Sequence, residues 1–113
     1  MATLLNEGQI KTILELDHGG ELLERLVNIF ETDIPPSIKA LEIAINNGQI
    51  DSIKKISHSI KSSSLNIGAA ELANIAGQLE SISDINTNHT TQLDQLRRCF
   101  ISSIEGLKGY LNS

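Results

Sequence analysis

The stretch HSIKSSSLNIGAAELANIAGQLE, residues 58–80, sets the pattern for the whole chain. Its apolar residues recur every three or four positions, which is the spacing of a helix that buries one face. Asn66 to Gly68 closes the first run, because Asn and Gly commonly end helices. The stretch therefore predicts two helices that meet at Gly68.

Helical spacing continues on both sides of this stretch, and strand-like alternation is absent. Towards the N-terminus we expect a short helix near residues 7–16 and a second helix that starts near Glu21. Pro35-Pro36 is expected to interrupt this second segment, either as a kink or with Asp33 capping a fresh helix. The segment should stop at Asn46-Asn47-Gly48.

The remaining helices complete the fold prediction. The helix that carries His58 begins at Asp51 or a neighbour, and the helix after Gly68 is rich in small residues that permit close helix contact. Ser81 to Thr91 is expected to be a polar loop, and a last helix should run from about Thr91 to Leu111. Four substantial amphipathic helices with short links predict an all-α fold, an up-and-down four-helix bundle with a short additional N-terminal helix. At this length we expect one domain over residues 1–113.

The overall composition restricts the classes of function. A net charge of −5 and a shortage of aromatic residues disfavour nucleic-acid binding. Cys99 is the one cysteine, so no disulfide framework can form, and this usage suits a reducing cytosol. Neither a signal peptide nor an apolar run long enough for a membrane is found, so we expect a cytoplasmic protein without a membrane partner. The initial Met and the compact length favour a stand-alone domain.

His58 is predicted to point away from the core. When Ile53 is set at zero on a helical wheel, the isoleucines of this helix centre on about 320°, whereas His58 falls at about 140°. Lys61, Ser62 and Leu65 fall on the same outer side. The wheel therefore predicts a solvent-facing imidazole with a cation one turn further on and an exposed leucine two turns further on.

An exposed histidine on a helix is most often ordinary surface, but two features favour a functional one here. Residues 51–70 hold three lysines and one aspartate, a local net charge of +2 in an acidic chain. The exposed Leu65 and the small serines around it would form a flat, partly apolar surface of the kind that partners use. The residues predicted to bind a partner are Lys54, Lys55, Ser62 and Leu65.

The residues that follow His58 resemble a known family. The pattern His-x-x-Lys-small, then Leu-x-x-Gly-Ala-x-x-Leu, then Leu-Glu is similar to that of histidine-containing phosphotransfer (HPt) domains. In this chain the pattern consists of His58, Lys61, Ser62, Leu65, Gly68-Ala69, Leu72 and Leu79-Glu80. The chain departs from the family at Ser62, where glycine is common, and at Ser57, where alanine is common.

The resemblance implies a histidine phosphotransfer protein of a two-component phosphorelay, without kinase activity of its own. His58 would accept a phosphoryl group from the aspartate of one receiver domain and pass it to the aspartate of another. Imidazole suits this role because its unperturbed pKa of about 6.5 leaves it neutral at physiological pH. Lys61 would offset the phosphate charge, and Glu80 would orient the ring from the neighbouring helix. Gly68 would adopt a positive φ and turn the chain so that Glu80 can approach.

No cofactor is expected on this chain. Neither a phosphate-binding glycine loop nor an acidic cluster beside His58 occurs, so Mg²⁺ and the acceptor aspartate would belong to the partner. The expected partners are receiver domains of a hybrid histidine kinase, of a response regulator, or of both.

Other classes of function remain open. The chief alternative is a non-catalytic helical adaptor that keeps the fold and does not relay phosphate. A metal site is weaker, because His18, His58 and His89 lie on separate elements with no metal-binding spacing. A hydrolase is weaker too, since no third group completes a triad near His58. His18 in a break and His89 in a loop are given no function, and Cys99 is expected to be a packing residue.

Overall fold

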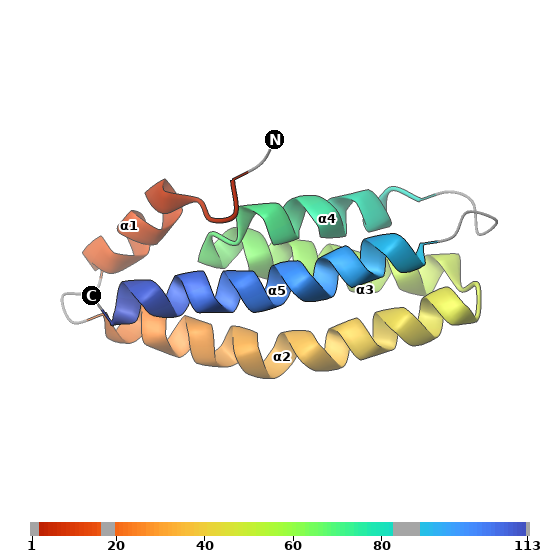
Figure 1. The fold of residues 1–113 in the computed structure, drawn as a ribbon, viewed down its shortest axis with the longest axis horizontal. Coiled ribbons are helices and arrows are strands. Elements are labelled where there is room, and N and C mark those ends of the chain that lie inside the picture. The colour runs from red at the N-terminus through yellow and green to blue at the C-terminus, as the bar shows by residue number, and fades with distance from the viewer. Residues whose placement is uncertain (1–2, 17–19, 83–88, 113) are drawn as a thin grey trace.

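The fold is an antiparallel bundle of helices. The computed structural model describes residues 3–16, 20–82 and 89–112, and no strand occurs in these ranges. The helices are α1 (Glu7–Leu16), α2 (Glu21–Asn46), α3 (Ile50–Ile67), α4 (Ala70–Glu80) and α5 (Thr90–Leu111). Consecutive helices from α2 to α5 run in opposite directions along the long axis (Figure 1). The predicted all-α, up-and-down four-helix bundle is therefore confirmed.

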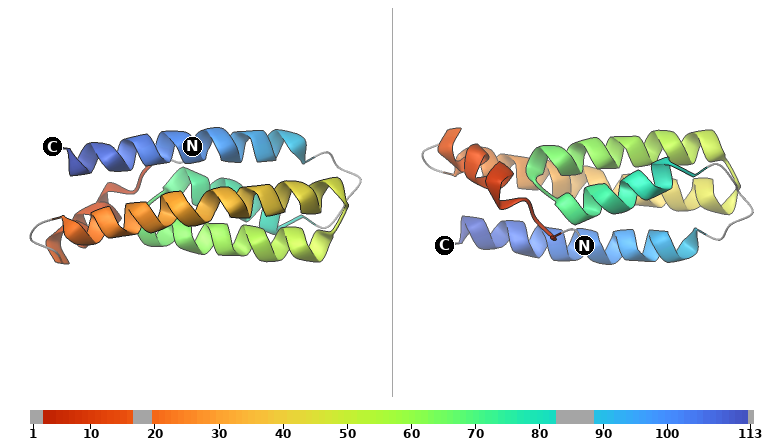
Figure 2. Two further views of the ribbon diagram at one scale, coloured as in Figure 1. Left: turned by 90° about the horizontal axis from the view of Figure 1, so that it is seen from below. Right: turned by 90° about the horizontal axis from the view of Figure 1, so that it is seen from above.

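The short α1 occupies one end of the bundle. Helix α4 is much shorter than the other three bundle helices, and α1 lies beyond its first residues, across the end of α3 and α2 (Figures 1 and 2). Ile10 and Ile13 of α1 are buried, at 0% and 5% exposure, so this helix extends the core where α4 does not reach. The additional N-terminal helix is thus part of the packed structure.

The core forms along the centre of the bundle because each helix buries one apolar stripe. Residues three, four or seven apart point inward, as the periodicity of an amphipathic helix requires. Phe30 of α2 and Phe100 of α5 meet there with ring centroids 5.6 Å apart. The largest fully buried apolar side chains are Ile10, Leu23, Val27, Leu41, Ile53, Ile60, Leu72, Leu79, Leu96 and Leu107. Each such burial contributes about 1.5–3 kcal/mol, before the loss of conformational entropy is counted.

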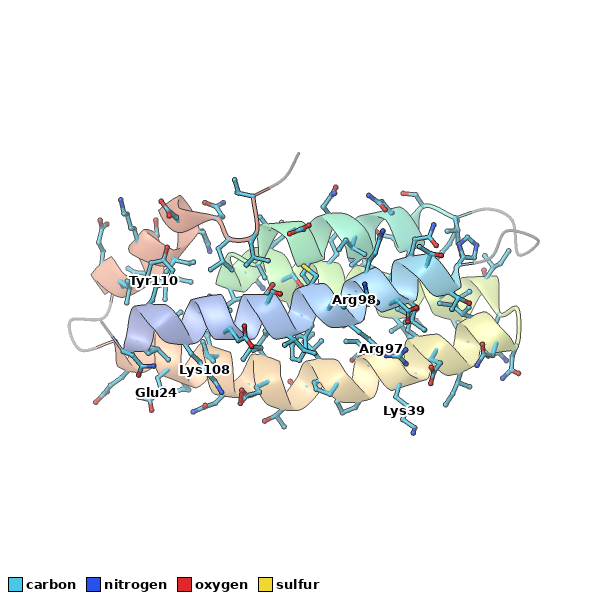
Figure 3. All side chains as sticks on the ribbon, in the orientation of Figure 1. Glu24, Lys39, Arg97, Arg98, Lys108 and Tyr110 are labelled. Atoms are coloured by element: carbon cyan, nitrogen blue, oxygen red, sulfur yellow. The ribbon has the colours of Figure 1, made fainter. Side chains whose placement is uncertain are left out.

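Salt bridges join α2 to α5 on the surface. Arg97 pairs with Glu42 at 2.6 Å and Lys108 pairs with Glu31 at 2.6 Å, and both basic side chains reach down from α5 towards α2 (Figure 3). All four side chains are at least 40% exposed, so these pairs add little to the stability of the fold. They show which residues of α2 and α5 lie opposite one another.

Pro35 and Pro36 do not interrupt α2. The helix is continuous through both prolines, so the fresh helix capped by Asp33 is wrong, whereas the alternative of a kink at this point stays a prediction. Both prolines are exposed, and the carbonyls that lose an amide partner can therefore be hydrated. Ile34 and Ile38, on either side of the pair, are 3% and 6% exposed and stay on one core-facing stripe. Burial of this stripe outweighs the local cost of the prolines.

The other helix ends agree with the sequence patterns to within a residue. Gly48 follows the end of α2 with a φ of 64°, and α3 starts at Ile50. His18 and residues 83–88 of the expected loop lie outside the described residues. His89 immediately precedes α5, at the end of the predicted loop, and is buried. Among the helices that the structure describes, none is both long and apolar enough to cross a membrane.

Gly68 joins α3 to α4 and is held by the N-terminal segment. Its φ is 85°, its amide donates to the carbonyl of Leu65, and its carbonyl accepts from the amide of Asn6 at 2.7 Å. The amide of Glu71 donates in turn to the carbonyl of Leu4 at 3.2 Å. A Cβ at position 68 would lie 3.1 Å from Ile10 Cγ1 and 3.2 Å from the Asn6 carbonyl oxygen. The turn therefore requires glycine for conformation and for space.

Replacement of Gly68 by alanine should destabilise the fold more than the same change at Gly20. Both glycines have a positive φ, but nothing lies within 4 Å of a Cβ at position 20. We expect Gly20→Ala to lower the free energy of unfolding by about 1 kcal/mol and Gly68→Ala by about 2–3 kcal/mol. Urea unfolding measures both values. Equal losses in the two variants would show that the N-terminal segment does not confine the turn.

Candidate functional site

His58 lies on the solvent side of α3, as the helical wheel predicts. Its side chain is 62% exposed, whereas Ile53, Ile60 and Ile67 on the opposite side of the helix are at most 2% exposed. The buried isoleucines fix the rotation of α3 about its axis, and this rotation presents the imidazole to solvent.

Glu80 approaches the ring from the neighbouring helix. It is the last residue of α4, which returns antiparallel to α3 after the turn at Gly68. Its Oε2 is hydrogen bonded to His58 Nδ1, and Lys61 Nζ donates to its Oε1 at 2.5 Å. The structure thus brings together His58, Lys61 and Glu80, the three residues predicted for phosphoryl chemistry.

The shared carboxylate assigns the tautomer of His58. An ionised carboxylate can only accept hydrogen bonds, so the ring atom that faces it must carry a proton. Nδ1 is therefore the protonated nitrogen, and the lone pair of Nε2 points away from Glu80. The arrangement leaves Nε2 as the unprotonated nitrogen of a ring that is 62% exposed.

Two cationic or potentially cationic partners stabilise the charge of Glu80. The hydrogen bond from Lys61, followed by that from His58, lowers the pKa of the Glu80 carboxyl below its ordinary value, although partial burial acts in the opposite direction. The Glu80 side chain is 24% exposed and that of Lys61 is 32% exposed, so the pair is only partly screened by water. Glu80 is therefore ionised at neutral pH.

Small residues on α4 allow the two helices to lie close together. A Cβ on Gly77 would be in van der Waals contact, at 3.5 Å, with Lys61 Cδ, so the lysine stem passes directly over this glycine. A groove of ≈ 660 Å³ opens between the helices next to Lys61. Its lining residues are Lys61, Leu65, Ala70, Ala73, Asn74, Gly77, Gln78 and Ser81.

The residues predicted to bind a partner surround His58 on α3. Lys55 and Ser62 are exposed, Leu65 is 56% exposed, and Lys54 is half-buried. Among the side chains that the structure describes, Leu65 is one of five large apolar ones with such exposure. It is also the one that lines the groove beside Lys61.

Two serines of α3 are buried, which the sequence reasoning missed. Ser57 and Ser64 are both 0% exposed. Ser64 Oγ donates to the carbonyl of Ile60 at 2.7 Å, whereas Ser57 Oγ has no hydrogen-bond partner among the described residues. On the wheel these serines fall at about 20° and 40°, close to the isoleucines, so the same geometry could have identified them.

Cys99 lies outside this site. Cys99 is buried on α5, and burial raises the pKa of its thiol. A group of three or more His, Cys, Asp or Glu side chains placed to hold a metal does not occur in residues 3–16, 20–82 and 89–112.

Comparisons with known proteins identify the family. The model of the Hpt domain matches residues 25–107, which span the bundle and the whole site. No curated protein matches the chain. Among solved structures, the chain is similar to histidine-containing phosphotransfer protein B (HptB) from Pseudomonas aeruginosa PAO1, with 22% identity and a TM-score of 0.83. This match covers 97% of this chain and 96% of the other.

A second solved structure agrees. The histidine-containing phosphotransfer domain of ArcB from Escherichia coli has 22% identity and a TM-score of 0.86, over 96% of this chain and 93% of the other. At this identity the two structures establish the shared fold, whereas the family model also matches the segment that carries His58. The chain therefore belongs to the Hpt domain family, and it is a histidine phosphotransfer domain of the phosphorelay type.

Proposed function

We propose that His58 carries the phosphoryl group and that Nε2 is the atom to which it is attached. The observation that supports this assignment best is the exposed ring whose Nδ1 is bonded to Glu80, because Nε2 then remains the available nucleophile. His89 is buried beside α5 and offers no comparable surface. Glu80 acts through His58 by orienting its ring, and Lys61 supplies positive charge one helical turn away.

The transfer itself is a substitution at phosphorus. The Nε2 lone pair attacks the phosphorus of the aspartyl phosphate on a receiver domain, the bond from phosphorus to the aspartate oxygen breaks, and the aspartate leaves as a carboxylate. The reverse sequence delivers the group to a second aspartate. Lys61 Nζ lies 2.5 Å from the carboxylate that also bonds the ring, and this proximity to the ring supports a role in offsetting the charge of the incoming phosphate.

Hpt domains are phosphoryl carriers rather than kinases, and they interact with receiver domains of two-component systems. We propose receiver domains of a hybrid histidine kinase, of a response regulator, or of both as partners, docking on Lys54, Lys55, Ser62 and Leu65. The acceptor aspartate and Mg²⁺ would belong to the receiver, because the one carboxylate bonded to His58 among the described residues is already shared with Lys61.

Replacement of His58 by glutamine should abolish phosphoryl uptake. Wild-type protein and His58→Gln are incubated with a receiver domain that carries a radiolabelled aspartyl phosphate, and label on the chain is measured after electrophoresis. We expect at least a hundredfold loss of label, because glutamine has no nucleophilic nitrogen. The ring is exposed, so the variant should keep the helical circular dichroism of the wild type. Equal labelling of the two proteins would favour the non-catalytic adaptor.

Replacement of Lys61 by alanine should slow uptake without preventing it. We expect the rate of phosphoryl transfer from the same donor to fall by about ten- to a hundredfold, because a positive charge beside the phosphate is removed. Lys108→Ala is a matched control, since Lys108 also pairs with a glutamate but lies on α5. A rate in Lys61→Ala equal to that of the control would remove Lys61 from the proposed mechanism.

The contribution of Glu80 to stability should disappear in acid. The pKa of Glu80 is lowered in the folded protein, so its contribution is present above the unfolded-state pKa and is lost as pH falls through the folded pKa. Urea unfolding of wild type and Glu80→Gln should give different midpoints at about pH 7 and the same midpoint at about pH 2–3.

The same comparison in a Lys61→Ala background identifies the cause. Lys61 is the largest contributor to the lowered pKa of Glu80, so the effect of Glu80→Gln should shrink when Lys61 is absent. A midpoint difference that is independent of pH and of Lys61 would contradict the electrostatic explanation.

A further inference from the structure

Both oxygens of the Glu80 carboxylate already have a donor. Oε2 is bonded to His58 Nδ1 and Oε1 to Lys61 Nζ. A carboxylate offers acceptor sites only, whereas a glutamine at this position could also donate through its NH₂ group. The Glu80 carboxylate can therefore accept a hydrogen bond from a protonated Nδ1, but it cannot donate one to an unprotonated Nδ1.

This restriction matters once the ring is phosphorylated. When the Nε2 lone pair has been used for the bond to phosphorus, Nδ1 can either keep its proton, which makes the ring cationic, or release it. Release would leave the Nδ1 lone pair directed at the lone pairs of Glu80 Oε2, because Lys61 Nζ, the nearby donor, is bonded to the other oxygen. Retention preserves a charge-assisted hydrogen bond between a cation and a carboxylate.

We propose that Glu80 keeps the proton on Nδ1 while Nε2 carries the phosphoryl group, so that the phosphorylated chain is a ready donor and not a lasting phosphoryl store. The inference rests on the proposed role of His58 and extends it to the regulation of phosphoryl lifetime. Glu80 is in this sense a positioning residue, which acts through the protonation state of the ring.

The chemical consequence concerns the leaving group. In onward transfer an aspartate oxygen attacks phosphorus, the N–P bond breaks, and its electron pair returns to Nε2. With Nδ1 protonated, the ring leaves as neutral imidazole and its Nδ1–H stays bonded to Glu80. With Nδ1 unprotonated, the ring would leave as an imidazolate anion, which is a much poorer leaving group. The proton on Nδ1, which is hydrogen bonded to Glu80, therefore accelerates loss of the phosphoryl group to aspartate or to water.

The surrounding charges support this arrangement. On α3 itself the charged side chains are Asp51, Lys54 and Lys55, which are seven, four and three residues before His58, together with Lys61. Helix α4 adds Glu71 in its first turn, at the opposite end of the helix from Glu80. On α2, Lys39 points away from the bundle (Figure 3).

No ion pair connects α1 or α2 to the site in the part of the chain that the structure describes. Lys61 and His58 both lower the pKa of the Glu80 carboxyl, so Glu80 is available as an ionised acceptor at neutral pH.

The lifetime of the phosphorylated ring tests the proposal. Wild type, Glu80→Gln and Glu80→Asp are loaded with phosphoramidate, which transfers its phosphoryl group to Nε2 and releases ammonia. After removal of the donor, loss of phosphohistidine is followed by phosphorus NMR between about pH 6 and pH 9. Glu42→Gln is the matched control, because Glu42 also pairs with a basic side chain and also has a lowered pKa, but lies on α2.

We expect Glu80→Gln to retain its phosphoryl group about tenfold longer than wild type at about pH 8, with its pH profile displaced by about one unit to lower pH. Glu80→Asp keeps an acceptor-only group, so its profile should follow the wild type in shape even if its absolute rate differs. Glu42→Gln should match the wild type. A merely structural role of Glu80 would change loading or rate at every pH without displacing the profile.

The outcomes distinguish the proposed role of His58 from the proposed role of Glu80. Failure of wild type to load, or equal loading of His58→Gln, overturns the proposed role of His58. Normal loading on His58 with identical pH profiles in wild type and Glu80→Gln overturns the proton-retention proposal and leaves the role of His58 intact. A profile in Glu80→Asp that follows Glu80→Gln and not the wild type also overturns it.

Discussion

The site depends on one carboxylate that receives two donors from a neighbouring helix. His58 and Lys61 are one turn apart on α3, whereas Glu80 is the last residue of α4, so their contact exists only if the two helices keep their spacing and register. Buried isoleucines fix the rotation of α3, and small residues on α4 let the helices approach. The chemistry of a single exposed imidazole thus rests on the packing of a helical hairpin.

The exposed position of His58 suits the proposed transfer, because a partner would complete the reaction. In the proposed mechanism His58, Lys61 and Glu80 act as nucleophile, cation and orienting carboxylate, and a second protein would supply the aspartate. A partner can reach the ring without a rearrangement of the bundle, because the His58 side chain is 62% exposed. In this proposal specificity would come from the side chains around the ring, among which Leu65 provides exposed apolar area.

Much of the fold could be predicted from periodicity and from Asn and Gly at helix ends, because both signals are local. The error at Pro35 and Pro36 arose where a local signal opposed a tertiary one, since burial of Ile34 and Ile38 keeps α2 continuous. The exposure of His58 followed from the wheel alone. The position of Glu80 required the family resemblance, because spacing within one helix cannot indicate which residue of another helix will face it.

The N-terminal segment has a consequence beyond its contribution to the core. Through Leu4 and Asn6 it is hydrogen bonded to both ends of the turn between α3 and α4, so three separate stretches of the chain meet at Gly68. A force applied to the N-terminal segment would consequently act on the turn at Gly68, from which α4 runs to Glu80. Anything attached before Leu4 would therefore be anchored to the hairpin that carries His58, and not to a remote edge of the bundle (Figure 1).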